Sequence, residues 1–136
     1  MIAVDTGPLV ALFDKDDNYH QTCISILKEI HEPLITTWPV FTEVMYLLRF
    51  SIHEQELCFE FIESGGVDIY SGNIHQVQRI HQLMKQYHDL PMDLADASIL
   101  VLTETKRITT IFTLDHRDFR LYIPTHIPSF FLIPEK

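Results

Sequence analysis

The sequence has few cysteines and no long hydrophobic run. Its two cysteines, Cys23 and Cys58, lie in apolar patterns of helical spacing and are not spaced like metal ligands. We therefore expect two reduced thiols in the core of a cytoplasmic protein. No apolar run reaches the roughly 18 residues that a membrane-spanning helix needs. Residues 1–5 lack a basic region and already include an acid, so we expect neither a membrane span nor a signal peptide.

Positive charge is also scarce. The chain has 10 Lys and Arg against 19 Asp and Glu, which gives a formal net charge of −9. This shortage disfavours broad electrostatic binding to nucleic acid, because affinity for a phosphate backbone comes largely from basic side chains. The excess of acid fits a local acidic site, a basic protein partner, or both.

Short apolar strands and amphipathic helices alternate along the chain. Its 136 residues, 46% of them hydrophobic, fit one domain over residues 1–136, without repeats or linkers. Strands are predicted at 2–4, 34–37, 67–70 and 109–114, with possible edge strands at 121–123 and 130–133. Helices are predicted at about 8–13, 19–31, 38–48, 53–63, 74–87 and 93–107. This alternation predicts a three-layer α/β/α fold around a central, mostly parallel sheet.

Two acidic residues stand directly after predicted strands. Asp5 follows the strand at 2–4, and Asp115 follows the strand at 109–114. Open α/β sheets place their sites at the carboxyl ends of their strands, so these acids would lie together if the two strands are neighbours. Asp5 could instead serve only as the cap of the helix that follows it.

Three further acids belong to helices with apolar surroundings. Asp93 and Asp96 share one face near the start of an apolar helix, where Asp93 could be a cap. Asp96 precedes an almost uninterrupted apolar run, and a carboxylate there is costly unless a cation meets it. Glu43 lies one turn inside another helix, among residues that we expect to be buried; the alternative is an ordinary exposed glutamate.

This set of acids favours a metal site. Carboxylates that converge on one place repel one another unless a divalent cation neutralises them. Mg²⁺ and Mn²⁺ prefer such oxygen ligands and keep positions open for water and phosphate oxygens. A site of this kind can activate a water for in-line attack on a phosphodiester. It requires no basic group around the metal, which would reconcile an acidic chain with a nucleic-acid substrate.

Four motifs follow one another in a specific order: residues 2–6 (Ile-Ala-Val-Asp-Thr), Glu43, residues 93–97 (Asp-Leu-Ala-Asp-Ala) and residues 113–119 (Thr-Leu-Asp-His-Arg-Asp-Phe). In this order they resemble the PIN domain family and, within it, the VapC-like toxin ribonucleases. The resemblance spans about the whole chain. It implies a parallel sheet of five strands and a nuclease that depends on Mg²⁺ or Mn²⁺ and cleaves RNA. It also implies a small antitoxin protein that blocks the site, and a homodimer.

The resemblance also assigns roles to residues. Asp5, Glu43 and Asp96 resemble the core metal-binding acids and Asp115 the fourth, and these four are the expected catalytic residues. Asp93 ranks below Asp96 as a further ligand. Supporting roles are expected from three residues near these acids: Thr6, Thr113 and Asp118. Asp118 would reach the metal through water or only hold its loop. Phosphate contacts are expected from three arginines, for which plain surface positions are the alternative: Arg107, Arg117 and Arg120.

Proteins of other classes also gather acids at strand ends. A receiver-type phosphoacceptor would need a lysine after a late strand, and none stands near Leu114 or Leu132. A haloacid-dehalogenase-like phosphatase would need a second acid two residues after Asp5, where Gly7 stands. A non-catalytic PIN-like module that binds a protein or RNA is the stronger rival. Its mark would be the loss of the acids, and since all four are present we favour the enzyme.

Overall fold

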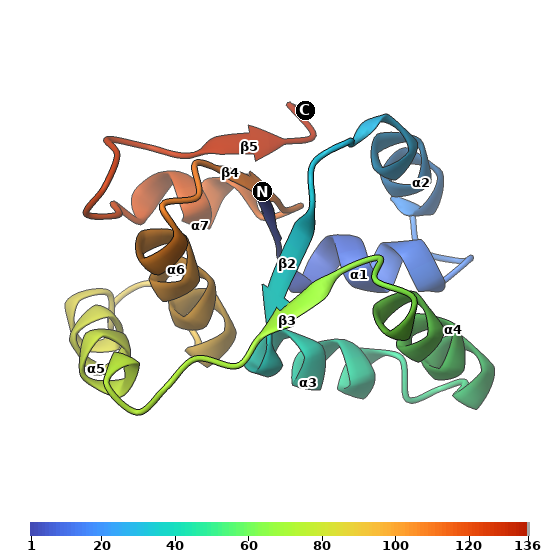
Figure 1. Cartoon of the computed structure of the whole chain (residues 1–136), viewed down its shortest axis with the longest axis horizontal. Helices are drawn as coiled ribbons and strands as arrows, with labels where there is room; N and C mark the ends of the chain where they lie inside the picture. Colours follow the sequence, from blue (N-terminus) through green and yellow to red (C-terminus); the bar gives the residue numbers. More distant parts are fainter. Residues whose placement is uncertain (136) are drawn as a thin grey trace.

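A parallel sheet of five strands forms the centre of the molecule. The computed structural model describes residues 1–135, and its strands follow the order β3-β2-β1-β4-β5, each parallel to its neighbours (Figure 1). They are β1 (Ile2–Val4), β2 (Leu34–Thr37), β3 (Asp68–Tyr70), β4 (Thr110–Phe112) and β5 (Phe131–Ile133). The central strand β1 is wholly buried, as expected for a parallel sheet that is covered on both faces.

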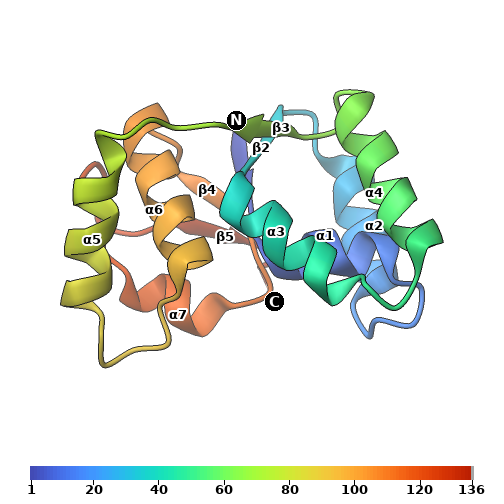
Figure 2. The ribbon, with the colours of Figure 1, turned by 90° about the horizontal axis from the view of Figure 1, so that it is seen from below.

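Seven helices surround this sheet within residues 1–135. They are α1 (Thr6–Phe13), α2 (His20–Glu29), α3 (Trp38–Leu47), α4 (Ile52–Glu63), α5 (Gln76–Gln86), α6 (Leu94–Lys106) and α7 (His116–Leu121). Figure 2 shows α5, α6 and α7 on one side of the sheet and α1, α2 and α4 on the other. The helix α3 contacts both α1 and α6. The expected α/β/α architecture with a five-stranded parallel sheet is therefore confirmed.

Local sequence signals explain where the helices begin. The side chain of Thr37 caps α3 by accepting a hydrogen bond from the backbone N–H of Val40, and Pro39 occupies the first turn. Asp93 caps α6 in the same way, by accepting a bond from the N–H of Asp96 at 2.9 Å. An apolar stretch of α6, from Ala97 to Thr103, is entirely buried. The helix α6 is therefore covered on several sides.

The segment after β4 differs from the prediction. Residues 121–123 were expected to form an edge strand, and this was wrong, because Leu121 ends the short helix α7 instead. The reason is that Phe119 and Tyr122, three residues apart, are both buried and stack edge to face at 5.5 Å. The second possible edge strand is confirmed, since β5 lies at the edge of the sheet beside β4.

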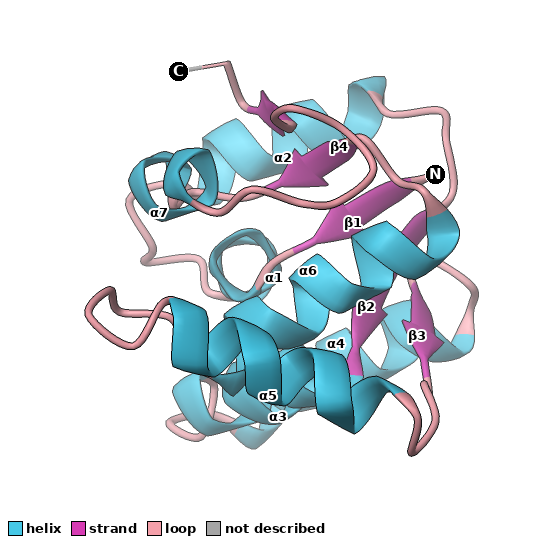
Figure 3. Ribbon diagram, turned by 90° about the vertical axis from the view of Figure 1, so that its left-hand side faces the viewer, coloured by secondary structure: helices cyan, strands magenta, loops and turns pink. Residues whose placement is uncertain are grey.

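Strand pairing brings the first and last motifs together. Strands β1 and β4 are parallel neighbours with Val4 opposite Phe112, and the N–H of Asp5 donates to the carbonyl of Phe112 at 2.9 Å. Figure 3 shows α1 and α7 following β1 and β4 at the same edge of the sheet. Asp5 and Asp115 therefore lie at adjacent strand ends, as expected.

The burial of the two cysteines and the lengths of the helices bear on the expectations from composition. Cys23 and Cys58 are free thiols in the core, and burial raises the pKa of each to about 11. No helix within residues 1–135 is long and apolar enough to cross a bilayer.

Candidate active site

A cavity of about 490 Å³ lies at the carboxyl ends of β1 and β4. Acidic side chains from the N-terminal ends of α1, α6 and α7 and from the middle of α3 reach it. Its walls are Asp5, Thr6, Gly7, Glu43, Leu47, Pro91, Asp93, Asp96, Leu114, Asp115 and Asp118. No lysine or arginine stands among these described lining residues. The cavity therefore concentrates negative charge without a protein cation to balance it.

Asp5 is the most deeply buried of these acids. Its side chain makes no capping bond to the first turn of α1, and Oδ2 instead accepts a hydrogen bond from the hydroxyl of Thr113 at 3.0 Å. Burial raises the pKa of Asp5 to about 6, and the charges of Asp115 and Glu43 add to this effect. The hydrogen bonds that Asp5 accepts act in the opposite direction. A simple capping role therefore does not account for Asp5.

Asp96 lies across the cavity at the start of α6. Burial raises its pKa to about 7, and the charges of Asp93, Asp5 and Asp115 raise it further. The hydroxyl of Tyr122 donates a hydrogen bond to Oδ2 of Asp96 at 3.1 Å, which opposes that rise. Asp96 thus lies close enough to the other acids for their charges to destabilise its ionised form.

Asp93 is both a helix cap and a lining residue of the cavity. It is the N-cap of α6, where its Oδ1 accepts the backbone N–H of Asp96, and its exposed side chain also lines the cavity. The capping function is confirmed by this bond. A contact between Asp93 and a metal stays a prediction.

Asp115 and Asp118 belong to the short helix α7. Asp115 is its N-cap: Oδ1 accepts the N–H of Asp118 at 3.3 Å, and its own N–H donates to the hydroxyl of Thr113 at 2.9 Å. Burial raises the pKa of Asp118, and contact with Asp115 adds to the effect. These bonds hold the loop through the backbone N–H of Asp118, and a role for the Asp118 side chain stays a prediction.

Glu43 and Thr6 complete the cavity. Glu43 is half-buried on α3, and its charge contributes to the raised pKa of Asp5. The hydroxyl of Thr6 is buried beside Asp5 and has no hydrogen-bond partner within residues 1–135. A buried polar atom without a partner is unfavourable unless a ligand or water satisfies it.

The residues present fit a hard divalent cation, although they are not already arranged around one. Within residues 1–135, no three His, Cys, Asp or Glu side chains stand in the geometry of a metal site. The donors are nevertheless all oxygens, neighbouring carboxylates help to raise the pKa of Asp5 and of Asp96, and the Thr6 hydroxyl in the same cavity lacks a partner. The acids that could hold the ion are Asp5, Glu43, Asp96 and Asp115.

The three arginines expected to contact phosphate lie in different places. Arg117 and Arg120 are exposed on α7, the helix that Asp115 begins. Arg107 is the C-cap of α6, which begins beside Asp93. Thirteen helical residues separate these ends, a distance of about 20 Å. The structure therefore places Arg117 and Arg120 on the helix that follows Asp115, although neither lines the cavity, and places Arg107 at the far end of α6.

Two features of the site have no counterpart in the sequence analysis. The contact between Tyr122 and Asp96 spans 26 residues, and no motif spacing indicates it. An apolar groove of about 580 Å³ also adjoins the cavity and shares Glu43 and Asp93 with it. Its other walls are Trp38, Pro39, Thr42, Tyr46, Leu94 and Ala95. The exposed aromatic residues on α3 are the signal that could have predicted a groove there.

Comparison with known proteins identifies the family. The profile of the PIN domain matches residues 2–122, which include every acid of the cavity. The chain belongs to the PIN domain family. The resemblance noted from the four motifs is thereby confirmed, and the match covers the sheet from β1 to β4.

Similar proteins include toxins of the VapC type. Ribonuclease VapC26 of Mycobacterium tuberculosis (strain ATCC 25618 / H37Rv) is 25% identical over 133 residues, 96% of this chain and 98% of that protein. The crystal structure of M. tuberculosis VapC20, a sarcin-ricin loop cleaving toxin, superposes with a TM-score of 0.78 at 17% identity, over 86% of this chain and 92% of VapC20.

Two structures of complexes contain the same fold. A toxin–antitoxin complex from Klebsiella pneumoniae has a chain with a TM-score of 0.67 and 21% identity, over 88% of this PIN domain chain and 90% of that chain. VapBC2 from Rickettsia felis, bound to a DNA fragment from its promoter, has a chain with a TM-score of 0.66 and 16% identity, over 97% of both chains. These likenesses show that the PIN domain chain shares its fold with chains of toxin–antitoxin complexes.

Proposed function

We propose that this PIN domain protein is an endoribonuclease that hydrolyses RNA phosphodiester bonds with the help of bound Mg²⁺ or Mn²⁺. The observation that carries the proposal is the convergence of Asp5, Glu43, Asp96 and Asp115 on one cavity that no described cation neutralises. Similarity to ribonuclease VapC26 along almost the whole chain supports RNA as the substrate. The proposed catalytic residues are these four acids.

The ion, when bound, would polarise a phosphate oxygen and lower the pKa of water. The chain's own residues would hold it and orient the reactants. Asp5 is kept in place by Thr113 and Asp96 by Tyr122, while the unpartnered hydroxyl of Thr6 offers a further polar group in the cavity. Arg117 and Arg120, exposed on α7, are the proposed contacts to RNA phosphates.

Cleavage assays with matched variants test this proposal. RNA is incubated with purified protein in Mn²⁺, in Mg²⁺ and in EDTA, beside Asp5→Asn, Asp96→Asn and the control Asp16→Asn. Asp16 is an exposed acid in the turn after α1, and its substitution removes the same charge outside the cavity. We expect metal-dependent cleavage by the wild type and the control, and a loss of about 100-fold or more in both cavity variants.

The rival function is a non-catalytic module that binds a protein or RNA. One observation favours this rival: within residues 1–135, no three acidic, histidine or cysteine side chains have the geometry of a metal site. Isothermal titration with Mn²⁺ separates the two functions. Neither cleavage nor Mn²⁺ binding by the wild type would reject the enzyme and favour the module.

We further propose that the protein is the toxin of a toxin–antitoxin pair in the cytoplasm and forms a homodimer. The two similar folds found in toxin–antitoxin complexes support a small antitoxin partner, and the net charge of −9 suits a basic one. Co-expression with the product of the neighbouring gene tests the pairing. A stable complex that suppresses cleavage is expected, and a neighbour that neither co-purifies nor inhibits would reject it.

A further inference from the structure

Tyr122 makes an unusual connection between the core and the acidic cavity. Its side chain is 1% exposed, yet its hydroxyl donates a hydrogen bond to Oδ2 of Asp96 at 3.1 Å. The ring is fixed by two aromatic neighbours, Phe119 at 5.5 Å and Tyr87 at 5.2 Å between ring centroids. Because the ring is held by packing, the hydroxyl is held in one place.

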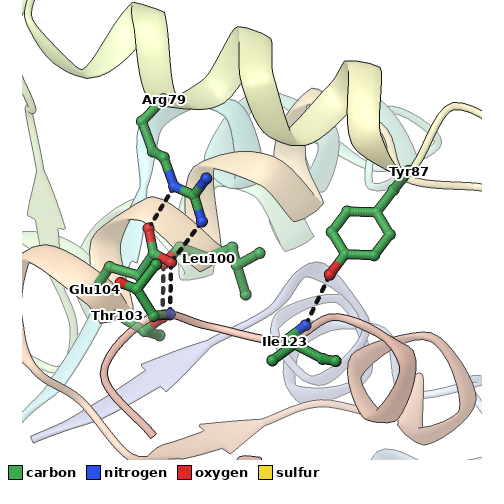
Figure 4. Close-up of polar contacts among 7 residues, drawn as sticks. Arg79, Tyr87, Leu100, Thr103, Glu104 and Ile123 are labelled. Carbon is green, nitrogen blue, oxygen red and sulfur yellow. Dashed lines mark hydrogen bonds and ion pairs between the residues drawn. The ribbon is translucent and has the colours of Figure 1, made fainter. Parts of the chain in front are cut away.

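A second bond anchors the same segment. The hydroxyl of Tyr87 accepts a hydrogen bond from the backbone N–H of Ile123 at 3.0 Å (Figure 4). Tyr122 is the C-cap of α7 and Asp115 is its N-cap, with only six helical residues between them. One short helix therefore carries Asp115 at one end and, at the other, the hydroxyl that touches Asp96.

We propose that Tyr122 is a positioning residue that orients the Asp96 carboxylate for the metal and holds it in register with Asp115. This inference rests on the proposed metal-dependent function. A tyrosine hydroxyl is suited to the task because it can orient a carboxylate while carrying no positive charge of its own. A lysine or arginine in the same place would neutralise Asp96 and compete with the cation.

The substitution Tyr122→Phe tests the proposal, because it removes the hydroxyl and keeps the ring in its aromatic cluster. The matched control is Tyr87→Phe, which also removes a hydroxyl from this aromatic cluster. The Tyr87 hydroxyl bonds to the backbone N–H of Ile123 and not to Asp96. We measure Mn²⁺ affinity by titration calorimetry without RNA, thermal unfolding without metal, and RNA cleavage over a range of Mn²⁺ concentrations.

We expect Tyr122→Phe to weaken Mn²⁺ binding by about 10- to 100-fold, the usual effect of losing a group that orients a ligand. Cleavage should fall at limiting Mn²⁺ and recover when Mn²⁺ is raised, while KM for RNA stays within twofold of the wild type. Tyr87→Phe should bind Mn²⁺ like the wild type even if it lowers the unfolding temperature.

Two results would overturn the role of Tyr122. One is wild-type Mn²⁺ affinity in Tyr122→Phe, and the other is an equal loss of affinity in Tyr87→Phe, which would indicate general loosening of the segment. A wild-type protein that neither binds Mn²⁺ nor cleaves RNA would reject the proposed function, and the role of Tyr122 with it. Measurements on the wild type alone therefore distinguish failure of the proposed function from failure of the role of Tyr122.

Discussion

The hydroxyl of Thr113 donates a hydrogen bond to Oδ2 of Asp5 at 3.0 Å, across 108 residues of sequence. The hydroxyl oxygen of Thr113 in turn accepts a hydrogen bond from the backbone N–H of Asp115 at 2.9 Å. Thr113 is fully buried, so one hydroxyl joins the two acids at the ends of β1 and β4. The hydrogen bond from Thr113 to Asp5 orients the Asp5 carboxylate. The hydrogen bond from the Asp115 N–H to Thr113 fixes the start of the loop that carries Asp115.

Replacing Thr113 with valine should therefore disturb both acids at once. The change keeps the shape of the side chain but leaves the Asp115 N–H without its acceptor and Asp5 without its donor. We expect the free energy of unfolding to fall by about 1 to 3 kcal/mol and Mn²⁺ affinity to weaken by about 10- to 100-fold. Denaturant unfolding and titration calorimetry measure the two effects.

Thr113→Ser is the matched control, because serine retains the hydroxyl. It should keep Mn²⁺ affinity close to that of the wild type. Equal affinities for the valine and serine variants would show that the hydroxyl does not organise the site.

The stability of the metal-free protein should depend on pH through Asp5 and Asp96. Burial first, and then neighbouring carboxylates, raise the pKa of Asp5 to about 6 and that of Asp96 to about 7, from an ordinary 3.8. The folded chain therefore holds these protons more tightly than the unfolded chain. Their contribution to stability is complete below about pH 4 and is lost as the pH rises through 6 and 7.

Thermal unfolding of metal-free protein between pH 4.5 and 8 measures this contribution. Asp5→Asn should gain stability relative to the wild type as the pH rises, because it removes a buried carboxylate that is charged only at higher pH. Asp16→Asn, at an exposed position, should follow the wild type throughout. Parallel curves for the wild type and Asp5→Asn would contradict the raised pKa of Asp5.

A separate ion pair should support the fold without affecting cleavage. Arg79 on α5 makes two bonds of 2.9 Å to Glu104 on α6 (Figure 4). Glu104 also accepts the backbone N–H of Thr125 at 2.9 Å. Glu104 is only 10% exposed, so Arg79→Ala leaves a largely buried carboxylate without its cation. We expect unfolding free energy to fall by about 1 to 3 kcal/mol.

Denaturant unfolding and RNA cleavage check this prediction together. Lys15→Ala, in the exposed turn after α1, is the control for loss of one positive charge and should leave stability unchanged. The cavity does not include Arg79, so cleavage at saturating Mn²⁺ should stay near the wild-type rate. A large loss of cleavage in folded Arg79→Ala would place the ion pair within the catalytic machinery.

Local chemistry explains why much of the fold could be predicted. The strands at Ile2–Val4 and Leu34–Thr37 have the predicted bounds, because both are short runs of apolar and β-branched residues. Thr37 caps α3 through a bond between residues only three apart, so the start of that helix is set by local sequence. Helix α7 was missed because it has six residues, too few to display a clear helical period.

The amino-acid sequence alone was enough to predict which acids stand at strand ends and helix starts, and it displays the order of motifs typical of the PIN domain family. These features follow from the chain's local pattern. The pairing of β1 with β4 and the contact of Tyr122 with Asp96 became known only from the folded chain. The physical reason is that such contacts join residues far apart in the chain, and packing of the whole core selects them.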